Sequence, residues 1–156
     1  MPATTRVRDV MTSAVVTLAP ERSVAEAADV LAEQGVGAIP VVDGSGRLLG
    51  LLRDEDLIVS EARVHVPTFI SFLGASIPLP GQMEHLEEEL HKVAGANVGD
   101  VMDDDPPTVG ADDSLEDLAT LMHDRDVSHV PVLDDDGRVV GIVARGDIVR
   151  FIARTT

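Results

Sequence analysis

The residues best suited to hold a charged ligand stand at the predicted start of a helix near the end of the chain. Arg145 and Gly146 follow an apolar run and open this helix. A guanidinium fork beside exposed backbone amides at a helix N-terminus can bind an anion. At the corresponding place in the first half, Asp54 and Glu55 crowd the helix start, and like charges repel a phosphate at short range. We therefore expect anion binding at Arg145.

Other reactive groupings have ordinary structural interpretations. The acidic runs 103–105 and 134–136 lack the alternating ligand spacing of a calcium loop, so we predict solvated turns. Two histidine–glutamate pairs at i, i+4 could coordinate a metal ion, but side-chain pairing on a solvent-exposed helix face is the preferred interpretation. These pairs are His85 with Glu89 and Glu87 with His91.

The composition argues against catalysis. The chain has no cysteine, which excludes a disulfide framework, a thiolate metal site and a cysteine nucleophile. No nucleophile is paired with a base in any motif. We therefore expect no enzymatic activity, no metal site and no required cofactor.

The charge of the chain limits its partners. Its formal net charge is -16, and Lys92 is its single lysine. Binding to nucleic acid or to an anionic membrane depends on clustered Lys and Arg, which this composition lacks. No apolar run follows Arg6 and Arg8, so we expect no signal peptide and a cytoplasmic location.

The elements that position the candidate residues occur twice. Residues 7–58 align without a gap with residues 98–149, and the matches include Val-x-Asp-Val-Met, one proline, two glycines and a late aspartate. A repeated unit of this kind cannot bury its apolar face alone, so the copies should pack together with any site between them. We divide the chain into a first repeat at 1–60, an insertion at 61–97 and a second repeat at 98–156.

The first helix of each copy is predicted from a capping box and an apolar stripe. Ser23 and Ser114 place a hydroxyl at the N-cap, and an acidic residue follows three positions on. Apolar residues then recur at i, i+3, i+4 and i+7, which is the pattern of one buried helix face. They are Val24, Ala27, Ala28 and Leu31, repeated as Leu115, Leu118, Ala119 and Met122.

Strands surround this helix in each copy. Pro40 and Pro131 should mark the beginning of a strand, because a central strand tolerates proline only there or at an edge. Turn sequences after these strands predict a hairpin into the next strand, with a second helix from about Asp54 and about Arg145. With short first strands at 15–18 and 108–109, the unit is strand, helix, strand, strand, helix, and the fold class is α+β.

This arrangement resembles the cystathionine beta-synthase (CBS) domain, here as a tandem pair or Bateman module. The motifs are Val-x-Asp-Val-Met and, after a helix, Ile/Val-Pro-Val-x-Asp-x-x-Gly-Arg-x-x-Gly with a later aspartate. The resemblance implies two pseudo-symmetric β-α-β-β-α repeats packed sheet to sheet, and a disc-shaped homodimer. It also implies a regulatory, non-enzymatic module that binds AMP, ADP, ATP or S-adenosylmethionine between the copies.

The resemblance assigns residues to two clefts. An aspartate in each copy would accept the ribose hydroxyls, since an ionised carboxylate can bond both. The segment before each proline and the loop after Val-Met would form the slot for the base. The residues of the first cleft are Val16, Val36, Gly37, Ala38, Pro40 and Asp56, and those of the second are Pro107, Val127, Ser128, His129, Pro131, Arg145 and Asp147.

The chain departs from the family at one position of each copy. Arg53 and Ala144 stand where the family commonly carries a Ser or Thr that helps hold phosphate. Both copies therefore lack this hydroxyl, and we favour the second cleft because of Arg145. Structural interpretations stay open as well: the two aspartates can complement helix dipoles, His129 can be a packed side chain, and Arg145 can pair with a surface carboxylate.

The insertion is composed differently from the repeats. Residues 64–80 carry no charge and include Phe69 and Phe72, but three prolines break them and they are too short for a membrane span. We predict that they pack against protein, which is a second copy of the chain, a partner or the flank of the same module, and we favour the second copy. Residues 83–93 follow with heptad-like apolar spacing, which suits a short interhelical seam.

Two functions fit this sequence. The first is a ligand sensor that changes the relative orientation of the copies and so modulates an effector protein, which the sequence does not identify. The second is a dimerisation scaffold or adaptor that binds no ligand. The missing Ser or Thr positions favour the second, and the intact slot segments favour the first.

Overall fold

The predicted order of elements, except the first strand of the first copy, is present in the residues that the computed structural model describes, 5–57 and 96–155. The first copy has α1 at Val24–Gln34, β1 at Ala38–Val42, β2 at Leu48–Arg53 and the start of a helix at 54–57. The second copy has β3 at Val109–Gly110, α5 at Leu115–Asp124, β4 at His129–Leu133, β5 at Val139–Ala144 and α6 at Arg145–Thr155. A short 3-10 helix, η1 at Val7–Asp9, begins the first copy, and a short helix, α4 at Val98–Val101, begins the second. The α+β class is thus confirmed.

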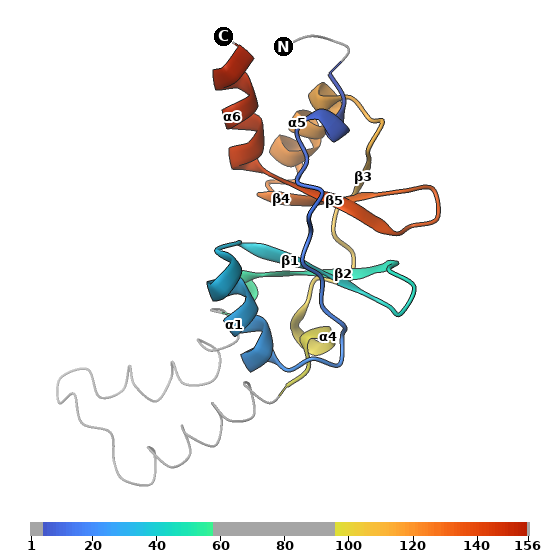
Figure 1. Cartoon of the computed structure of the whole chain (residues 1–156), viewed down its shortest axis with the longest axis vertical. Coiled ribbons are helices and arrows are strands. Elements are labelled where there is room, and N and C mark those ends of the chain that lie inside the picture. The colour runs from blue at the N-terminus through green and yellow to red at the C-terminus, as the bar shows by residue number, and fades with distance from the viewer. Residues whose placement is uncertain (1–4, 58–95, 156) are drawn as a thin grey trace, which may run out of the picture.

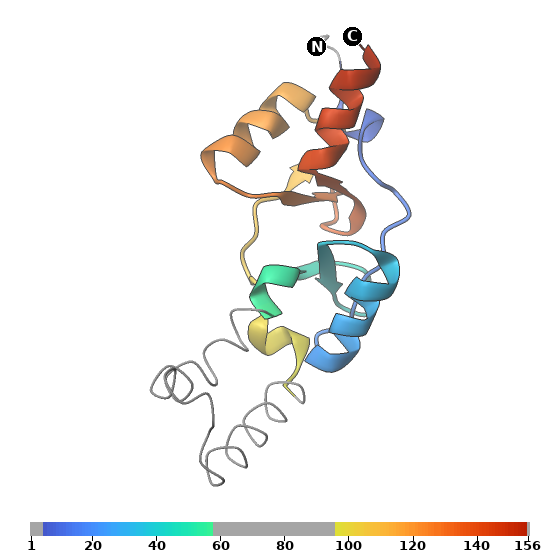
Figure 2. The same cartoon turned by 90° about the vertical axis from the view of Figure 1, so that its left-hand side faces the viewer.

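The two sheets face each other across a seam, and the helices lie on their outer sides (Figure 1). β1 pairs antiparallel with β2, while β4 pairs with β5 antiparallel and with β3 parallel. Figure 2 shows the same stacking from the side, with α5 and α6 beyond one sheet and α1 and α4 beyond the other. The copies therefore pack sheet to sheet, as predicted.

The hydroxyl caps that were predicted for the two first helices are present. Ser23 Oγ accepts a hydrogen bond from Glu26 N at 3.1 Å, and Ser114 Oγ accepts one from Asp117 N at 3.1 Å. The reciprocal half of the first capping box is missing, because the Glu26 carboxylate accepts a bond from the Ser23 hydroxyl at 3.3 Å. Of the predicted apolar stripe on α1, Ala28 is exposed, and the remaining members are buried.

The proline positions were predicted wrongly, because Pro40 and Pro131 stand in the middle of β1 and β4. Pro40 pairs with Leu51 of β2, and its carbonyl accepts a hydrogen bond from Leu18 N at 3.1 Å. The Pro40 nitrogen faces this same edge of β1, where the pairing with Leu18 starts one residue later. No hydrogen bond of the sheet therefore requires an N–H at Pro40. Pro131 has the equivalent register against Ile142.

The strand predicted at 15–18 was also wrong, because only Leu18 pairs, in a single bridge with Val41. In the second copy β3 extends the same pairing to Gly110. To continue the pairing, the residue two positions after the bridged residue must donate its N–H. This residue is Ala111 in the second copy and Pro20 in the first. Proline has no N–H to donate, so the first strand stops at one residue.

The hydrophobic core of each copy includes a residue from the first element of the other copy. Val7 of η1 is buried in the second copy's core, with Leu115 and Leu118. Val98 of α4 is buried in the first copy's core, with Ala27 and Ile39. The chain therefore crosses the seam twice between these cores. The division into 1–60, 61–97 and 98–156 stays a prediction.

Gly50 and Gly141 lie directly beneath the crossing segments. Thr12 and Ile142 exchange two backbone hydrogen bonds of 2.9 and 3.0 Å, and Asp103 and Leu51 do the same. A Cβ on Gly50 would stand 2.6 Å from the carbonyl oxygen of Asp103, and one on Gly141 would stand 2.6 Å from Met11 Sδ. This close approach explains why the Val-Met motif and the glycine occur together in both copies.

Several predictions concern residues outside the described ranges. They are the dimer contact at 64–80, the heptad-like helix at 83–93 and the histidine–glutamate pairs within it. Within 5–57 and 96–155, no helix has the length and apolar character that crossing a membrane requires.

Replacing Gly50 by Ala should destabilise the fold by about 1–3 kcal/mol, because the added methyl group overlaps the Asp103 backbone. Urea denaturation measures the change. Gly44→Ala is the control, since a Cβ there meets nothing within 4 Å. Equal stability of the two variants would contradict the close contact.

Candidate functional site

A crevice of about 490 Å³ opens at the seam beside the start of α6. Both copies and one crossing segment form its walls. The first copy contributes Arg53 and Glu55, the crossing segment contributes Asp103, Asp105 and Pro107, and the second copy contributes Arg125, Asp126, Val127, Ser128 and Arg145. Pro107, Val127, Ser128 and Arg145 are residues that the sequence assigned to the second cleft. The structure brings these four together.

The start of α6 is tied to the base-slot segment of its own copy. Arg145 N donates a hydrogen bond to the Ser128 carbonyl at 3.0 Å, and Asp54 N bonds the Gly37 carbonyl at 3.0 Å in the first copy. The Arg145 guanidinium lies 3.1 Å from Asp126 and 3.3 Å from the Val127 carbonyl. Arg145 thus pairs with a surface carboxylate at the rim of the crevice, where its side chain is 56% exposed.

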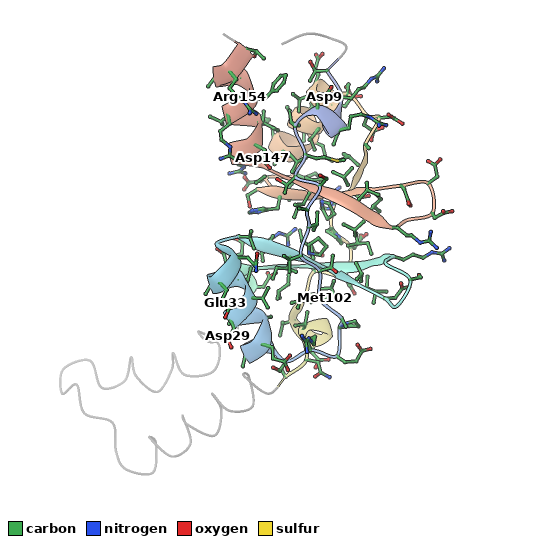
Figure 3. All side chains as sticks on the ribbon, in the orientation of Figure 1. Asp9, Asp29, Glu33, Met102, Asp147 and Arg154 are labelled. Carbon is green, nitrogen blue, oxygen red and sulfur yellow. The ribbon has the colours of Figure 1, made fainter. Side chains whose placement is uncertain are left out.

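Both family aspartates cap the helices that they open. Asp147 Oδ2 accepts a hydrogen bond from Ala144 N at 2.8 Å, and Oδ1 pairs with Arg150. Asp56 Oδ2 accepts a bond from Arg53 N at 2.9 Å. Asp147 lies at the base of α6, next to the end of β5 (Figure 3). A carboxylate has about four lone-pair sites, so the bonds of Asp147 leave capacity for ribose hydroxyls.

His129 is packed across the seam. Its Nδ1 lies 2.9 Å from Ser128 Oγ, and its ring lies close to Gly37 of the other copy. A Cβ on Gly37 would be 3.0 Å from His129 Cε1. Burial lowers the pKa of His129 below its ordinary value of 6.5, against the opposing effect of nearby carboxylates such as Asp54.

The residues assigned to the first cleft are less well gathered. Val16 and Val36 are exposed, and Gly37 lies against the His129 ring. Ala38, Pro40 and Pro131 are buried within their strands, so their side chains do not line the crevice beside α6.

Sequence reasoning missed the residues that give the crevice its charge. Among the described residues, three arginines and four carboxylates line it. Arg145 alone of these was assigned to a cleft by name, while Asp103 and Asp105 lie in the loop that was assigned to the base slot. The others, which are Arg53, Glu55, Asp103, Asp105, Arg125 and Asp126, have no apolar periodicity or motif to reveal them. Arg53 gave one signal, since it replaces the family's hydroxyl residue. Within the described ranges, no three acidic or histidine side chains are arranged to hold a metal ion.

The CBS domain profile matches residues 7–62 and 98–154, which is most of the chain and both copies of the repeat. The chain belongs to the CBS domain family. Its two domains form the tandem pair that the repeat predicted.

Similar proteins carry the same pair. CBSX2 of Arabidopsis thaliana, a chloroplastic CBS domain-containing protein, is 31% identical over 132 residues, which are 84% of this chain and 56% of CBSX2. The chain thus spans little more than half of this relative. YhcV of Bacillus subtilis is 31% identical over 91% of this chain and 81% of its own length.

Solved structures extend the likeness to ligand complexes. A crystal structure of CBSX2 in complex with AMP is 29% identical, covers 97% of this chain and 98% of the other, and has a TM-score of 0.73. The CBS domain pair of protein MJ0100, in complex with 5'-methylthioadenosine and S-adenosyl-L-methionine, is 25% identical over 95% and 99% of the two chains, with a TM-score of 0.69.

The partly buried position of His129 should make stability depend on pH. Its pKa is lowered in the folded state, so the unfolded chain binds the proton more readily and stability falls as the pH drops below 6.5. Urea unfolding at about pH 7.5 and about pH 5.5 should show a smaller loss for His129→Gln than for the unsubstituted protein. An NMR titration midpoint for His129 at or above 6.5 would contradict this assignment.

Proposed function

We propose that this CBS pair binds one adenosine-containing ligand in the crevice beside α6 and, through it, modulates a partner protein. The supporting observation is the crevice itself, which is lined by both copies and has the volume of a small-molecule site. The AMP complex of CBSX2 and the S-adenosyl-L-methionine complex of MJ0100 support an adenosine moiety as the ligand.

The second crevice is favoured over its counterpart in the first copy. Pro107, Val127 and Ser128 offer an apolar wall and backbone groups for a base, while Arg145 stands at the rim. In the counterpart, the His129 ring lies against Gly37, and Asp54 replaces the arginine. The favoured crevice offsets its carboxylates with three arginines among the described residues, whereas its counterpart carries a carboxylate in place of the rim arginine, so we propose a single occupied site per chain.

Regulation would follow from the lining of the crevice. A ligand that contacts Arg53 of one copy, Val127 of the other and Pro107 of the crossing segment stabilises one relative arrangement of the three. Such a ligand changes the balance between arrangements by its difference in affinity for them. We propose that the pair binds its ligand without catalysing a reaction.

A scaffold that binds no ligand is the second candidate. It is favoured by Ala144, which offers no hydroxyl for a phosphate, and by the capping bonds that Asp56 and Asp147 already make.

The proposal also includes a homodimer. Val149 and Ile152 on α6 are 64% and 45% exposed, which is unusual for large apolar side chains on one helix. Val149 also lines an apolar groove between α5 and α6, together with Met122 and Ile148. A second copy of this chain, placed with its own α6 face here, would cover both surfaces.

Ligand binding is tested by calorimetry with AMP and S-adenosylmethionine. Val127→Ala should weaken binding roughly tenfold, because two methyl groups of the proposed base slot are lost. Val36→Ala changes the equivalent residue of the first copy and should leave the affinity unchanged. If neither AMP nor S-adenosylmethionine binds, the scaffold is favoured. If Val36→Ala weakens binding and Val127→Ala does not, the ligand lies in the other crevice.

The dimer is tested by light scattering of a Val149→Glu, Ile152→Glu double variant, which should shift the protein to a monomer. Leu49→Glu introduces the same charge at an exposed apolar residue of the β1–β2 hairpin and should keep the dimer. A dimer that survives the double variant excludes α6 as the interface.

A further inference from the structure

Arg53 belongs to the first copy, but its side chain lies in the wall of the second copy's crevice. It ends β2 and directly precedes the helix at 54–57. Its Nη1 lies 3.1 Å from Asp103 Oδ2 on the crossing segment, and its side chain is only 11% exposed. Among the described residues, ion pairs hold two arginines of the crevice, Arg53 and Arg145. The pair of Arg53 is the less exposed, because Arg145 and its partner are both mostly exposed.

The Arg53–Asp103 ion pair is not required by the fold. The repeat provides an internal comparison, because the positions equivalent to Arg53 and Asp103 are Ala144 and Thr12. The second half makes the same backbone contacts with these uncharged residues: Thr12 and Ile142 exchange the same two hydrogen bonds as Asp103 and Leu51. The ion pair is therefore a feature of one crevice, added to a backbone that folds without it.

The geometry also leaves Arg53 free to change its partner. A guanidinium carries five N–H donors, and a single one is recorded bonding Asp103. Asp103 Oδ1 accepts a hydrogen bond from Asp105 N at 3.0 Å, which holds the carboxylate in its turn independently of Arg53. A phosphate presents acceptor oxygens that suit the guanidinium fork, and a charge-assisted bond is strong at a poorly exposed site.

We infer that Arg53 selects ligands that carry a phosphate, and that the ligand's phosphate competes with Asp103 for the Arg53 guanidinium. This inference rests on the proposed binding of an adenosine moiety in the same crevice. Without ligand, Asp103 holds Arg53 and ties the end of β2 to the crossing segment. With a phosphate-bearing ligand, Arg53 turns to the phosphate, and the side-chain tie between these two segments is released. The exchange couples occupancy of the crevice to the link between the two halves.

The experiment compares adenosine with AMP on the full chain by calorimetry. AMP should bind more tightly than adenosine in the unsubstituted protein, by about tenfold or more. Arg53→Met should remove most of this preference and leave adenosine binding unchanged. Asp103→Asn should strengthen AMP binding severalfold, because it weakens the competitor. The double variant should bind AMP like Arg53→Met alone, since Asp103 acts through Arg53.

Arg22→Met is the matched control, because it removes one positive charge from an exposed arginine at the start of α1, away from the crevice. It should keep the preference for AMP, which separates a local contact from the loss of net charge. Arg53→Lys keeps the charge without the fork, folds with less disturbance, and should retain part of the preference.

The outcomes separate the inference from the function on which it rests. If adenosine, AMP and S-adenosylmethionine all fail to bind, the proposed function fails. If S-adenosylmethionine alone binds, the function stands and the selection by Arg53 fails. If both bind with equal affinity, or adenosine alone binds, the function stands and the selection by Arg53 fails. An unchanged preference in Arg53→Met and Arg53→Lys, or weaker AMP binding by Asp103→Asn, also overturns the inference.

Discussion

The close contact between each crossing segment and a glycine of the opposite sheet is the constraint on which the rest of the structure depends. At Gly50 and Gly141 the backbone of one half lies within van der Waals distance of the other, and paired hydrogen bonds fix the register. Val7 and Val98 then enter cores that belong to the opposite copies. Separating the halves would open both cores at once, so the halves stay joined at the seam and the crevice is present without a ligand.

The backbone has the two-fold symmetry of the repeat, but the side chains at the seam do not. The bridges of one crossing recur 91 positions later in the other, and the two hairpins pair with each other at Arg47 and Arg138. At the crevice, however, charged residues on one side correspond to uncharged ones on the other, as Arg53 to Ala144 and Asp103 to Thr12. The repeat therefore supplies two equivalent places whose side chains differ in charge. The chemistry of the site is decided by these few side chains and not by the fold.

The parts of the fold that depend on local sequence could be predicted, and the parts that depend on contacts across the seam could not. Ser23 caps its helix, and the Asp43 and Asp134 turns form hairpins with Gly46 and Gly137 at positive φ. Pro40 was misplaced because its tolerance depends on which edge of β1 its nitrogen faces, and this is set by Leu18. Arg53 could be noted only as a missing hydroxyl, because no local pattern indicates that its side chain reaches into the crevice of the other copy.

Because the chain is acidic, the binding of an anionic ligand would depend on the arginines in the crevice. A net charge of -16 repels an anionic ligand at long range, but salt screens such repulsion beyond about 8 Å at physiological ionic strength. Affinity for a phosphate must therefore come from short-range contacts with a poorly exposed cation, where screening is weakest. Arg53 meets this condition, and Asp103 balances its charge while no ligand is bound. An arginine this poorly exposed would be costly without such a partner in a ligand-free protein, so the carboxylate that we propose competes with the ligand also allows the arginine to occupy the crevice.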